Sequence, residues 1–597
     1  MHVRNEEAAA FAAAAESQVT GRLAVCAGSC GPGNTHLIQG LYDAHRSGAA
    51  VLALASHIPS AQIGTSYFQE THPEQLFAEC SYFCELRSSP LQMPRLLRIA
   101  MQTSLGRGGV SVLTIPGDLS AQPATNATKL SDLVTSPPAA SLHRRSRNGL
   151  QTCSITRTPS PSSQALASAT HEVLTLAATL NAPIGHSLGG KEWIQYDNPY
   201  DVGMSGLLGY GACYEATHSA DLLFLLGTDF PYDSFLPQAH TVQIDRDQPP
   251  LGRRSILDLG IAGDVGQTLR AVLPLLRRKT QRTFLDRMLK QHAEALERVV
   301  AAYTRNIEHM RPIHPEYVAA QLDSLAAEDA IFTVDTGMCN VWGARYLTPN
   351  GRRRVLGSFR HGSMANALFH AVGAQLAAPN RQVVSISGDG GLSMLMGELI
   401  TAHTHQLPLT VVVFNNSSLG MIRLEMMAAG YPYYQTDHGL VDYAAIAAAC
   451  GLQASAVDDP AEVFCHALAE ALAYDGPSLV DVRTDPNALS LPPHHHRPAG
   501  RRLRPGLHQN RSRRRRRADA RARTQQPAKH LQALSTSVYR RGVPLLIRPV
   551  RWPVAKLHRP TFRAVRRPGS QWGYAPTAAA IPGTCSSTDS ISVSSMR

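Results

Sequence analysis

One stretch of the sequence, residues 382–416, constrains the fold more than any other. It consists, in order, of an apolar strand Gln382–Ser387, the turn Gly388–Gly391, a helix from about Leu392 to Thr404 and a strand Leu409–Asn416. Glycines at a strand end let the backbone approach a diphosphate, and the start of a helix offers it unpaired N–H groups. Asp389 and Asn416 add oxygen ligands from two adjacent strand ends, which suits a magnesium ion that bridges phosphate oxygens. The alternative is a plain turn, because Gly-Asp-Gly is a common turn sequence.

The strand–helix–strand pattern recurs along the chain and predicts an α/β fold. Residues 22–56 alternate an apolar strand, a glycine-rich turn (Gly28–Asn34), an amphipathic helix and a second strand, and residues 181–190 and 221–247 repeat the pattern. Repeated units of this kind build parallel sheets covered by helices on both faces. A chain of 597 residues that is 44% apolar can bury several cores, so we expect three or more domains.

Charge is distributed unevenly between the body of the chain and its last part. From Leu491 onward there are 23 Lys and Arg against two Asp and no Glu, which leaves 34 basic and 43 acidic residues before it. The net charge of +12 therefore combines an acidic body with a basic appendage. Such a body lacks the basic balance of a nucleic-acid-binding protein.

Two stretches break the α/β pattern. Residues 136–167 are rich in Ser, Thr, Pro and Arg, contain no acidic residue and have no sustained periodicity, so we expect a disordered insert. From Pro492 to the end, 21 Arg stand against two Lys, with an unbroken run at Arg513–Arg517. This composition is compatible with a functional basic tail, but it favours translation of GC-rich DNA in a shifted frame.

The cysteines and the N-terminus bear on the cellular compartment. The ten cysteines include the pairs Cys26/Cys30 and Cys80/Cys84 but no zinc-type pairs with histidine partners, so reduced, mostly buried thiols are expected. A metal site remains the alternative, because a three-residue gap can place two thiols on one helix face. The sequence has no apolar run long enough to span a membrane and no export signal, which predicts a cytoplasmic protein.

The Gly-Asp-Gly turn followed by Asn415-Asn416 resembles the signature of enzymes that bind thiamine diphosphate through magnesium. By this resemblance, Asp389, the Asn416 side chain and the Ser418 carbonyl would bind the metal. Residues 361–367, HGSMANA, match the family segment in which a bulky side chain, here Met364, bends the cofactor. The residues that the resemblance assigns to this cofactor are Gly362, Ser363, Met364, Asp389, Gly390, Gly391, Asn416, Ser417, Ser418, Leu419, Gly420, Met421 and Ile422.

Thiamine chemistry also needs a carboxylate that can protonate the pyrimidine ring of the cofactor. Shielding from water keeps the proton affinity of such a group useful near neutrality. The segment RNEEAAAFA, residues 4–12, resembles the activating stretch of the family and places Glu6 at the catalytic position. Two glutamates that open a helix are otherwise ordinary surface residues that complement the helix dipole. The turn Gly28–Asn34 downstream favours the catalytic interpretation.

Longer stretches resemble the thiamine-diphosphate pyruvate oxidases that pass electrons to ubiquinone. They include LAVCAGSCGPGNTHLIQGLYDAHRSGAAVLALASHIPS, GTSYFQETHPEQLFAECSYFCEL, GKEWIQYDNPYDVGMSGLLG and ISGDGGLSMLMGEL, within about Met1–Thr125 and His171–Leu491. The resemblance implies three doubly wound parallel-sheet domains. These would be a pyrimidine-binding domain (1–126), a central flavin-binding domain (169–310) and a diphosphate- and magnesium-binding domain (311–491), with an atypical linker at 127–168 and an arginine-rich tail at 492–597.

The same resemblance implies oxidative decarboxylation of pyruvate to acetate and carbon dioxide, with electrons passing through FAD to a quinone. The active site would lie between the first domain of one subunit and the third of another, in a homodimer or, typically, a tetramer. Pyruvate would meet Phe68 and Gln69. Asp245 closes a strand as the ribose-binding acid of dinucleotide folds does, although an aspartate there is also a common turn residue. The flavin-binding residues would be Ser205, Gly206, Leu207, Leu208, Thr228, Asp229, Phe230, Pro231, Tyr232 and Asp245.

The sequence departs from this family in four places. It begins almost at Glu6, so we expect the first strand and helix of the first domain to be missing and a sheet edge to be exposed. The stretch 136–167 replaces the start of the flavin domain, so we expect it to affect whether that domain retains its flavin. Nothing after Pro492 has the apolar periodicity of the family's lipid-binding helix, so a peripheral position at the inner membrane would rest on basic charge alone. Met421 stands where the quinone-linked enzymes carry an aromatic residue.

Two other functions remain open. A carboligase of the acetolactate-synthase type shares the domains and the thiamine signature, but joins a second keto acid to the first. An inactive, frameshifted remnant, or a protein whose basic tail binds polyanions, is a different class altogether. Analysis of the products formed from pyruvate separates the oxidase from the carboligase.

Overall fold

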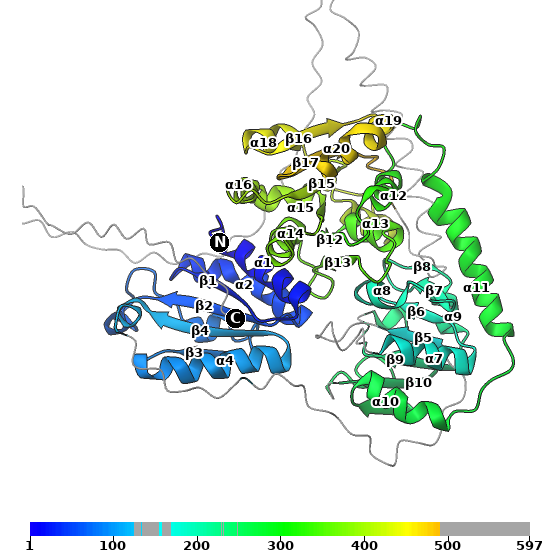
Figure 1. Ribbon diagram of the computed structural model, residues 1–597, viewed down its shortest axis with the longest axis horizontal. Coiled ribbons are helices and arrows are strands. Elements are labelled where there is room, and N and C mark those ends of the chain that lie inside the picture. The colour runs from blue at the N-terminus through cyan, green and yellow to red at the C-terminus, as the bar shows by residue number, and fades with distance from the viewer. Residues whose placement is uncertain are drawn as a thin grey trace, which may run out of the picture. The chain divides into compact units, whose positions relative to one another are not determined.

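The computed structural model describes residues 1–123, 133, 154–157, 169–228, 230, 232–246 and 249–489. All of these except Met1 belong to one compact unit, His2–Ser512. The tail 492–597 and most of the stretch 136–167 lie outside the described residues, so their disorder stays a prediction. Three sheets of predominantly parallel strands, with helices packed against them, confirm the predicted α/β fold (Figure 1).

The N-terminal sheet has four parallel strands. Their spatial order is β1 (Ala24–Gly28), β2 (Val51–His57), β4 (Val110–Pro116) and β3 (Phe83–Leu86). Successive strand residues face opposite sides, so Val51 and Ala53 pack with helices α1 (Glu6–Thr20) and α2 (Pro32–Ser47), while Leu52 packs with α4 (Met93–Arg107). Strand β1 lies at the edge of the sheet, and its Val25 is 52% exposed.

The central sheet corrects one sequence prediction. Its spatial order is β11 (Leu259–Ala262), β10 (His240–Asp245), β9 (Leu222–Leu226), β5 (Ser154–Arg157), β6 (Ile184–His186), β7 (Asp201–Met204) and β8 (Tyr210–Gly211). Strand β5 falls within the stretch predicted to be disordered, and that prediction is wrong for these four residues. Parallel pairing with β6 and β9 on both sides satisfies the β5 backbone, and Ile-Thr at its centre suits a strand. Strand β8 is antiparallel to β7.

Short helices surround the central sheet. They are α7 (Thr170–Leu180), α8 (Leu188–Ile194), α9 (Cys213–His218), α10 (Val265–Val272) and α11 (Thr283–Ala295). Across the described residues, no helix combines the length and the apolar content that a membrane crossing requires.

The third sheet has six parallel strands. Their order is β13 (Arg354–Gly357), β12 (Ile331–Val334), β14 (Val383–Gly388), β15 (Leu409–Asn415), β17 (Ser478–Arg483) and β16 (Gln453–Val457). Every residue of β15 is buried, as expected for a strand covered on both faces. The helices include α12 (Pro315–Leu325), α13 (Met338–Tyr346), α14 (Asn366–Ala377), α17 (Gly420–Ala428), α18 (Tyr443–Ala449) and α20 (Leu468–Ala473).

The helix expected from Leu392 to Thr404 has different bounds. Helix α15 (Asp389–Leu395) begins at Asp389, a 3₁₀ turn η8 (Met396–Glu398) interrupts it, and α16 (Leu399–Thr404) completes it. The extended Gly388, at φ −80° and ψ 148°, serves as the N-cap, so the strand leads into the helix without a separate turn. Asp389 is therefore the first helical residue.

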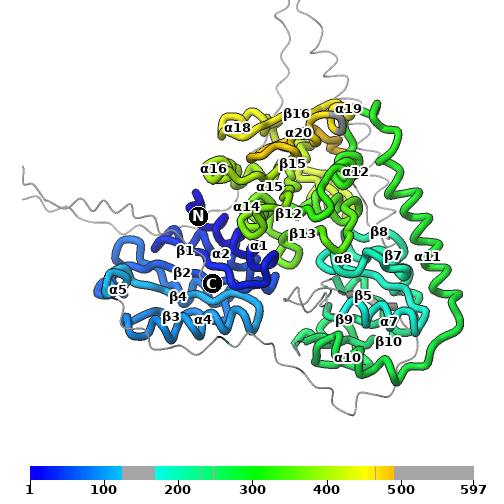
Figure 2. Tube along the Cα trace, in the orientation of Figure 1, coloured from blue at the N-terminus to red at the C-terminus, as the bar shows by residue number. Residues whose placement is uncertain are grey.

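Helix α1 is packed tightly between α2 and α14, which Figure 2 shows beside it. A Cβ at Gly40 of α2 would lie 2.8 Å from the Glu7 carbonyl oxygen, and one at Gly373 of α14 would lie 2.0 Å from the Ala12 carbonyl oxygen. Glycine at these two positions lets the helix backbones approach more closely than any side chain would allow. Phe11 of α1 stacks on Phe369 of α14, with ring centroids 6.1 Å apart.

Arg354 joins residues from all three sheet-forming regions. Its Nε lies 3.0 Å from Glu192 Oε2 of α8, and its Nη2 donates to the Gln18 carbonyl of α1 at 3.2 Å. The same Glu192 oxygen accepts the Val355 N–H at 2.9 Å. Both charged side chains are largely buried, so this ion pair is hydrogen-bonded and shielded from water.

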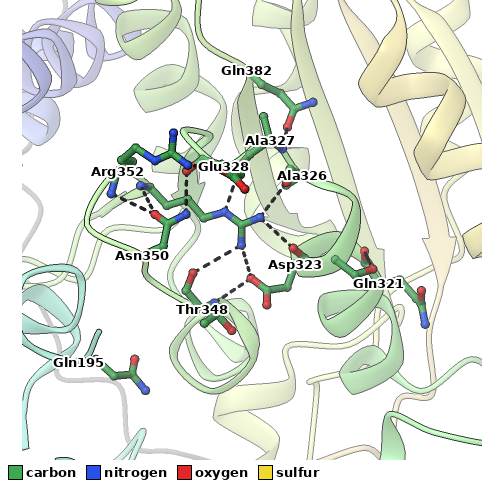
Figure 3. A network of polar contacts seen from close by, with 12 residues as sticks. Gln195, Gln321, Asp323, Ala326, Ala327, Glu328, Thr348, Asn350, Arg352 and Gln382 are labelled. Carbon is green, nitrogen blue, oxygen red and sulfur yellow. Dashed lines mark hydrogen bonds and ion pairs between the residues drawn. The ribbon is translucent and has the colours of Figure 1, made fainter. Parts of the chain in front are cut away.

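Arg353 caps the end of α12, and Figure 3 labels its partners Asp323, Ala326 and Ala327. Its guanidinium donates to the carbonyls of Asp323 at 3.0 Å, Ala326 at 2.7 Å and Ala327 at 3.1 Å, and to Asp323 Oδ1 at 2.8 Å. The last carbonyls of a helix have no partner within the helix, and the fork of Arg353 satisfies that of Asp323, together with the carbonyls just after the helix and a carboxylate.

We predict that Arg353→Ala lowers the unfolding free energy by about 3 kcal/mol, because it removes the donor to the Asp323 and Ala326 carbonyls and the charged partner of the Asp323 carboxylate. Arg353→Lys keeps the charge but not the fork, so its loss should be smaller. Urea unfolding of the purified variants measures both changes. A loss below about 0.5 kcal/mol for Arg353→Ala would contradict this account.

Candidate active site

The carboxyl ends of β14 and β15 bring Asp389, Asn416 and Ser417 together. The Asp389 carboxylate is buried, and its Oδ1 accepts the Gly390 N–H at 2.8 Å while Oδ2 accepts the Ser417 N–H at 2.6 Å. Asn416 directly follows β15, and its Oδ1 accepts the Ser418 N–H at 2.9 Å. Carboxylate, amide and carbonyl oxygens of this kind form the donor set that magnesium prefers.

Residues from later segments complete the surroundings of Asp389. Burial raises the pKa of Asp389, and His438, whose Nε2 lies 3.6 Å from Oδ2, partly offsets this effect. The Tyr443 hydroxyl donates to the Asp389 carbonyl at 2.9 Å. The Ser418 hydroxyl donates to the Thr436 carbonyl at 3.2 Å. Sequence reasoning missed His438 and Tyr443, because no local motif connects them to the turn.

Close contacts explain the glycines at the start of α15. A Cβ at Gly390 would lie 2.7 Å from Leu419 Cδ2 and 3.5 Å from Met364 Cε, so Met364 reaches the start of this helix. A Cβ at Gly391 would lie only 1.9 Å from Asp335 Oδ2. Asp335 follows β12, is fully enclosed, and has a pKa that burial raises to about 7.

The remaining residues of the predicted set lie at the start of α17. The Leu419 N–H donates to the Thr436 carbonyl at 2.8 Å, which anchors the entry to this helix. A Cβ at Gly420 would lie 2.8 Å from Met338 Cγ. Met421 packs against the core of the third sheet, whereas Ile422 is exposed.

The segment that carries Met364 is held by side chains of α2. The Ser358 hydroxyl donates to Asp43 Oδ1 at 2.6 Å and accepts the Ser363 N–H at 2.9 Å. Gln39 donates to the Ser363 hydroxyl at 2.9 Å. Gly362 adopts φ +78°, where glycine carries no steric penalty. Asp43 is completely buried, so the N-terminal region fixes the position of a residue of the third sheet's region through hydrogen bonds shielded from water.

Glu6 opens α1 and lies at the glycine-rich turn after β1. Its Oε2 lies 3.0 Å from His36 Nδ1, and its Oε1 accepts the Ser29 hydroxyl at 3.4 Å. Burial raises its pKa, but hydrogen bonds from its own backbone N–H, His36 and Ser29 outweigh burial, so the pKa is lowered. The side chain is 25% exposed. The expected shielding from water is therefore not met within one chain.

Gln69 lies at the same turn as Glu6. Its Oε1 accepts the Cys30 thiol at 3.3 Å, and a Cβ at Gly31 would lie 2.8 Å from Gln69 Cβ. Gln69 adopts φ +64°, a strained conformation for a residue with a side chain. The neighbouring Phe68 is 79% exposed. The structure thus groups Glu6 with Gln69 on the first sheet, and Asp389 with Asn416 and Met364 on the third.

Two of the predicted flavin segments meet at the carboxyl edge of the central sheet. Gly206 follows β7 with φ +96°, and a Cβ there would lie 3.1 Å from the Phe230 ring and 3.6 Å from the Tyr232 ring. Ser205 is buried, Leu207 is exposed, and Leu208 packs against apolar cores. The buried Thr228 accepts a hydrogen bond from Gln243 at its carbonyl, 3.0 Å away. The buried Asp245 ends β10 at the same edge, while Asp229 and Pro231 lie outside the described residues.

The cysteines predicted to be reduced, mostly buried thiols bear on whether the protein has a metal site of the zinc type. Every cysteine that the structure reports on is a free thiol, and burial raises the pKa of Cys26, Cys80 and Cys84 to about 12. Among the described residues, no three His, Cys, Asp or Glu side chains gather closely enough to bind a metal. A metal at Asp389 would therefore depend on amide and carbonyl oxygens as well as on carboxylate.

Comparison with known proteins assigns the family. Sequence models of thiamine pyrophosphate enzymes match residues 1–76 (N-terminal TPP binding domain), 163–272 (central domain) and 335–482 (C-terminal TPP binding domain). A putative thiamine pyrophosphate-containing protein, YdaP of Bacillus subtilis, is 36% identical over 490 residues, 81% of this chain and 84% of the relative. The chain belongs to the thiamine pyrophosphate enzyme family.

More distant members of the thiamine pyrophosphate enzyme family differ in the activity that their names record. A pyruvate oxidase of Lactiplantibacillus plantarum is 28% identical over 512 residues, 81% of each chain. A probable acetolactate synthase large subunit of Methanococcus aeolicus is also 28% identical, over 82% of this chain and 86% of the relative. Identity to these relatives alone does not separate oxidase from carboligase.

We predict that Gly391→Ala lowers the thermal midpoint of the protein, because its methyl group would overlap Asp335 Oδ2, at a cost of about 1–3 kcal/mol. Gly397→Ala is the matched control, since a Cβ there meets nothing within 4 Å. Adding Asp335→Ala to Gly391→Ala should recover part of the loss. Equal midpoints for the Gly391 and Gly397 variants would refute the contact.

Proposed function

We propose that this protein oxidatively decarboxylates pyruvate to acetate and carbon dioxide, using thiamine diphosphate, magnesium and FAD, and transfers two electrons to a quinone. The observation that carries the thiamine part is the Asp389 cluster. In this member of the family, a buried carboxylate and Asn416 lie at the ends of two adjacent strands. In this proposal Asp389, the Asn416 amide and the Ser418 carbonyl hold magnesium. Gly390, Gly391 and residues 417–422 line the diphosphate.

When bound, thiamine diphosphate supplies a nucleophilic carbon and an electron sink for decarboxylation, and FAD supplies a two-electron acceptor. The chain's own residues would position the cofactor and pyruvate and would transfer protons. Glu6 would exchange a proton with the bound cofactor, and Met364, which reaches Gly390, would contact it. Gln69 and Phe68 contact pyruvate. Water supplies the oxygen of acetate, and two protons and two electrons leave with the quinol.

The exposed apolar side chains support a homo-oligomer, at least a dimer. Phe68 and Tyr67, which precede Gln69, are exposed, and so are Tyr431, Tyr434 and Leu440 in the segment between α17 and α18. Exposed apolar side chains that form a contiguous patch commonly mark an interface. Covering Glu6 with a second copy would remove the water that lowers its proton affinity, and would raise its pKa toward the range needed for proton exchange.

The contacts of the central sheet support FAD as the electron acceptor within the protein. Gly206 meets Phe230 and Tyr232 at the edge where β10 ends in the buried Asp245. An acid at a strand end is placed as dinucleotide folds place their ribose-binding residue. Strand β5 completes the middle of this sheet, which favours a central domain able to retain a flavin.

Calorimetry tests the cofactor part of the proposal. We predict that the wild-type protein binds thiamine diphosphate in the presence of Mg²⁺, and that chelation with EDTA weakens binding by at least about tenfold. Asp389→Ala should abolish binding, because it removes the buried carboxylate proposed to hold magnesium. Asp458→Ala, at an exposed aspartate of the same sheet region, is the control and should bind as the wild type does. Wild-type binding that is unaffected by Asp389→Ala would rule the cluster out.

Product analysis tests the reaction. With pyruvate and a quinone analogue, we predict acetate and reduced acceptor in equal amounts, together with a flavin spectrum that bleaches when pyruvate is added without acceptor. Acetolactate formed without an acceptor would instead establish the carboligase, the second candidate, which the 28% identity to an acetolactate synthase supports.

A further inference from the structure

Glu398 is a buried carboxylate, 2% exposed, with no assigned role in the proposed chemistry. It ends the 3₁₀ turn η8, between α15 and α16 of the third sheet's region. Its Oε1 accepts two backbone N–H groups from the other end of the chain, those of Arg4 at 2.8 Å and Asn5 at 2.7 Å. A buried carboxylate needs such donors, because desolvation without hydrogen bonds is costly.

The other oxygen of Glu398 is also held. Its Oε2 accepts the hydroxyl of Thr401, which is buried one turn further along the chain. Both carboxylate oxygens of Glu398 are therefore held by hydrogen bonds, Oε1 by the N-terminal segment and Oε2 by its own region. The rotamer of Glu398 is set by its own region, and it presents Oε1 to the N-terminal segment as a fixed acceptor.

The two N–H groups belong to the residues that lead directly into Glu6. Asn5 is the N-cap of α1, with φ −137°, and its side chain accepts the Glu7 N–H at 2.9 Å. Glu398 fixes the backbone before the cap, and the cap fixes the first turn after it. The backbone on both sides of Glu6 is thereby held, and its carboxylate can reach His36 and Ser29.

We propose that Glu398 is a positioning residue that sets the orientation of Glu6 through the backbone of residues 4 and 5. The inference rests on the proposed role of Glu6 as the proton-exchanging carboxylate. The geometry also joins Glu398 to the Asp389 end of the site, because α15 begins at Asp389 and η8 follows it without a break. Small changes in a fixed acceptor alter catalysis strongly when they move a reacting group by a fraction of an ångström.

The first test measures amide hydrogen exchange in the protein without cofactor. Glu398→Ala removes both hydrogen bonds, so exchange at the amides of residues 4–7 should accelerate by about tenfold. Glu398→Gln retains an oxygen acceptor and should accelerate exchange less than about threefold. Glu470→Ala, at an exposed glutamate of α20, should leave these amides unchanged. If Glu398→Ala leaves exchange at residues 4–7 unchanged, the contact does not hold Glu6 and the proposal fails.

The second test separates positioning from a general structural role. With saturating thiamine diphosphate and Mg²⁺, Glu398→Ala should lower kcat at least about tenfold and change the Kd of thiamine diphosphate less than about threefold, while Glu398→Gln keeps most of kcat. Equal losses in the Ala and Gln variants would overturn the proposal, as would an unchanged kcat in Glu398→Ala.

Two further results keep the test decisive. If Glu398→Ala does not fold, Thr401→Val releases Oε2 while leaving the carboxylate, and should accelerate exchange at residues 4–7 by an intermediate factor; unaltered exchange would count against the proposal. If the wild type binds no thiamine diphosphate, the proposed function fails. The exchange measurement then still reports whether Glu398 holds the α1 start.

Discussion

The close packing of α1 against α2 and α14 is the constraint on which the site depends. Gly40 and Gly373 remove the side chains that would keep the helix backbones apart, and the seven alanines of α1 offer little bulk on either side. The helix that carries Glu6 at its first position is therefore fixed against both the first and the third sheet regions. Interiors packed at this density do not deform smoothly, so the position of Glu6 follows from the packing rather than from its own loop.

Buried hydrogen bonds also connect the first and third sheet regions, and each region supplies a carboxylate that holds a segment of the other. Asp43 of α2 holds Ser358 and through it the segment of Met364, while Glu398 of the third region holds the backbone before Glu6. Each carboxylate is shielded from water, which strengthens its hydrogen bonds and makes their loss costly. The two groups of candidate catalytic residues are thus each oriented by a carboxylate from the other region.

The parts of the site that the sequence predicted are those with a local signature. Asp389 and Asn416 lie at the ends of neighbouring parallel strands, and one strand–helix–strand unit places them together. His36, Asp335 and Glu398 were missed, because their roles arise from contacts between segments far apart in the chain. From the sequence alone, Glu398 is indistinguishable from an ordinary polar residue between two helices.

The differences in fold have similar causes. Composition made residues 136–167 look structureless, yet β5 gains its stability from strands on both sides, and four residues cannot carry that signal alone. The helix start at Asp389 depends on the conformation of Gly388, which sequence pattern does not fix. The parallel-sheet class was predictable, since the repeated pattern is spread over hundreds of residues.

The position of α1 has a consequence for how the protein is made. Ala8, Phe11 and Ala15 are synthesised more than 300 residues before their packing partners Leu368 and Phe369. At synthesis rates of about 5–20 residues per second, the apolar side of this helix stays without its packing partners for on the order of tens of seconds. Completion of the Glu6 end of the site is therefore a late event in biosynthesis, because it requires α14 and Glu398 to have been synthesised.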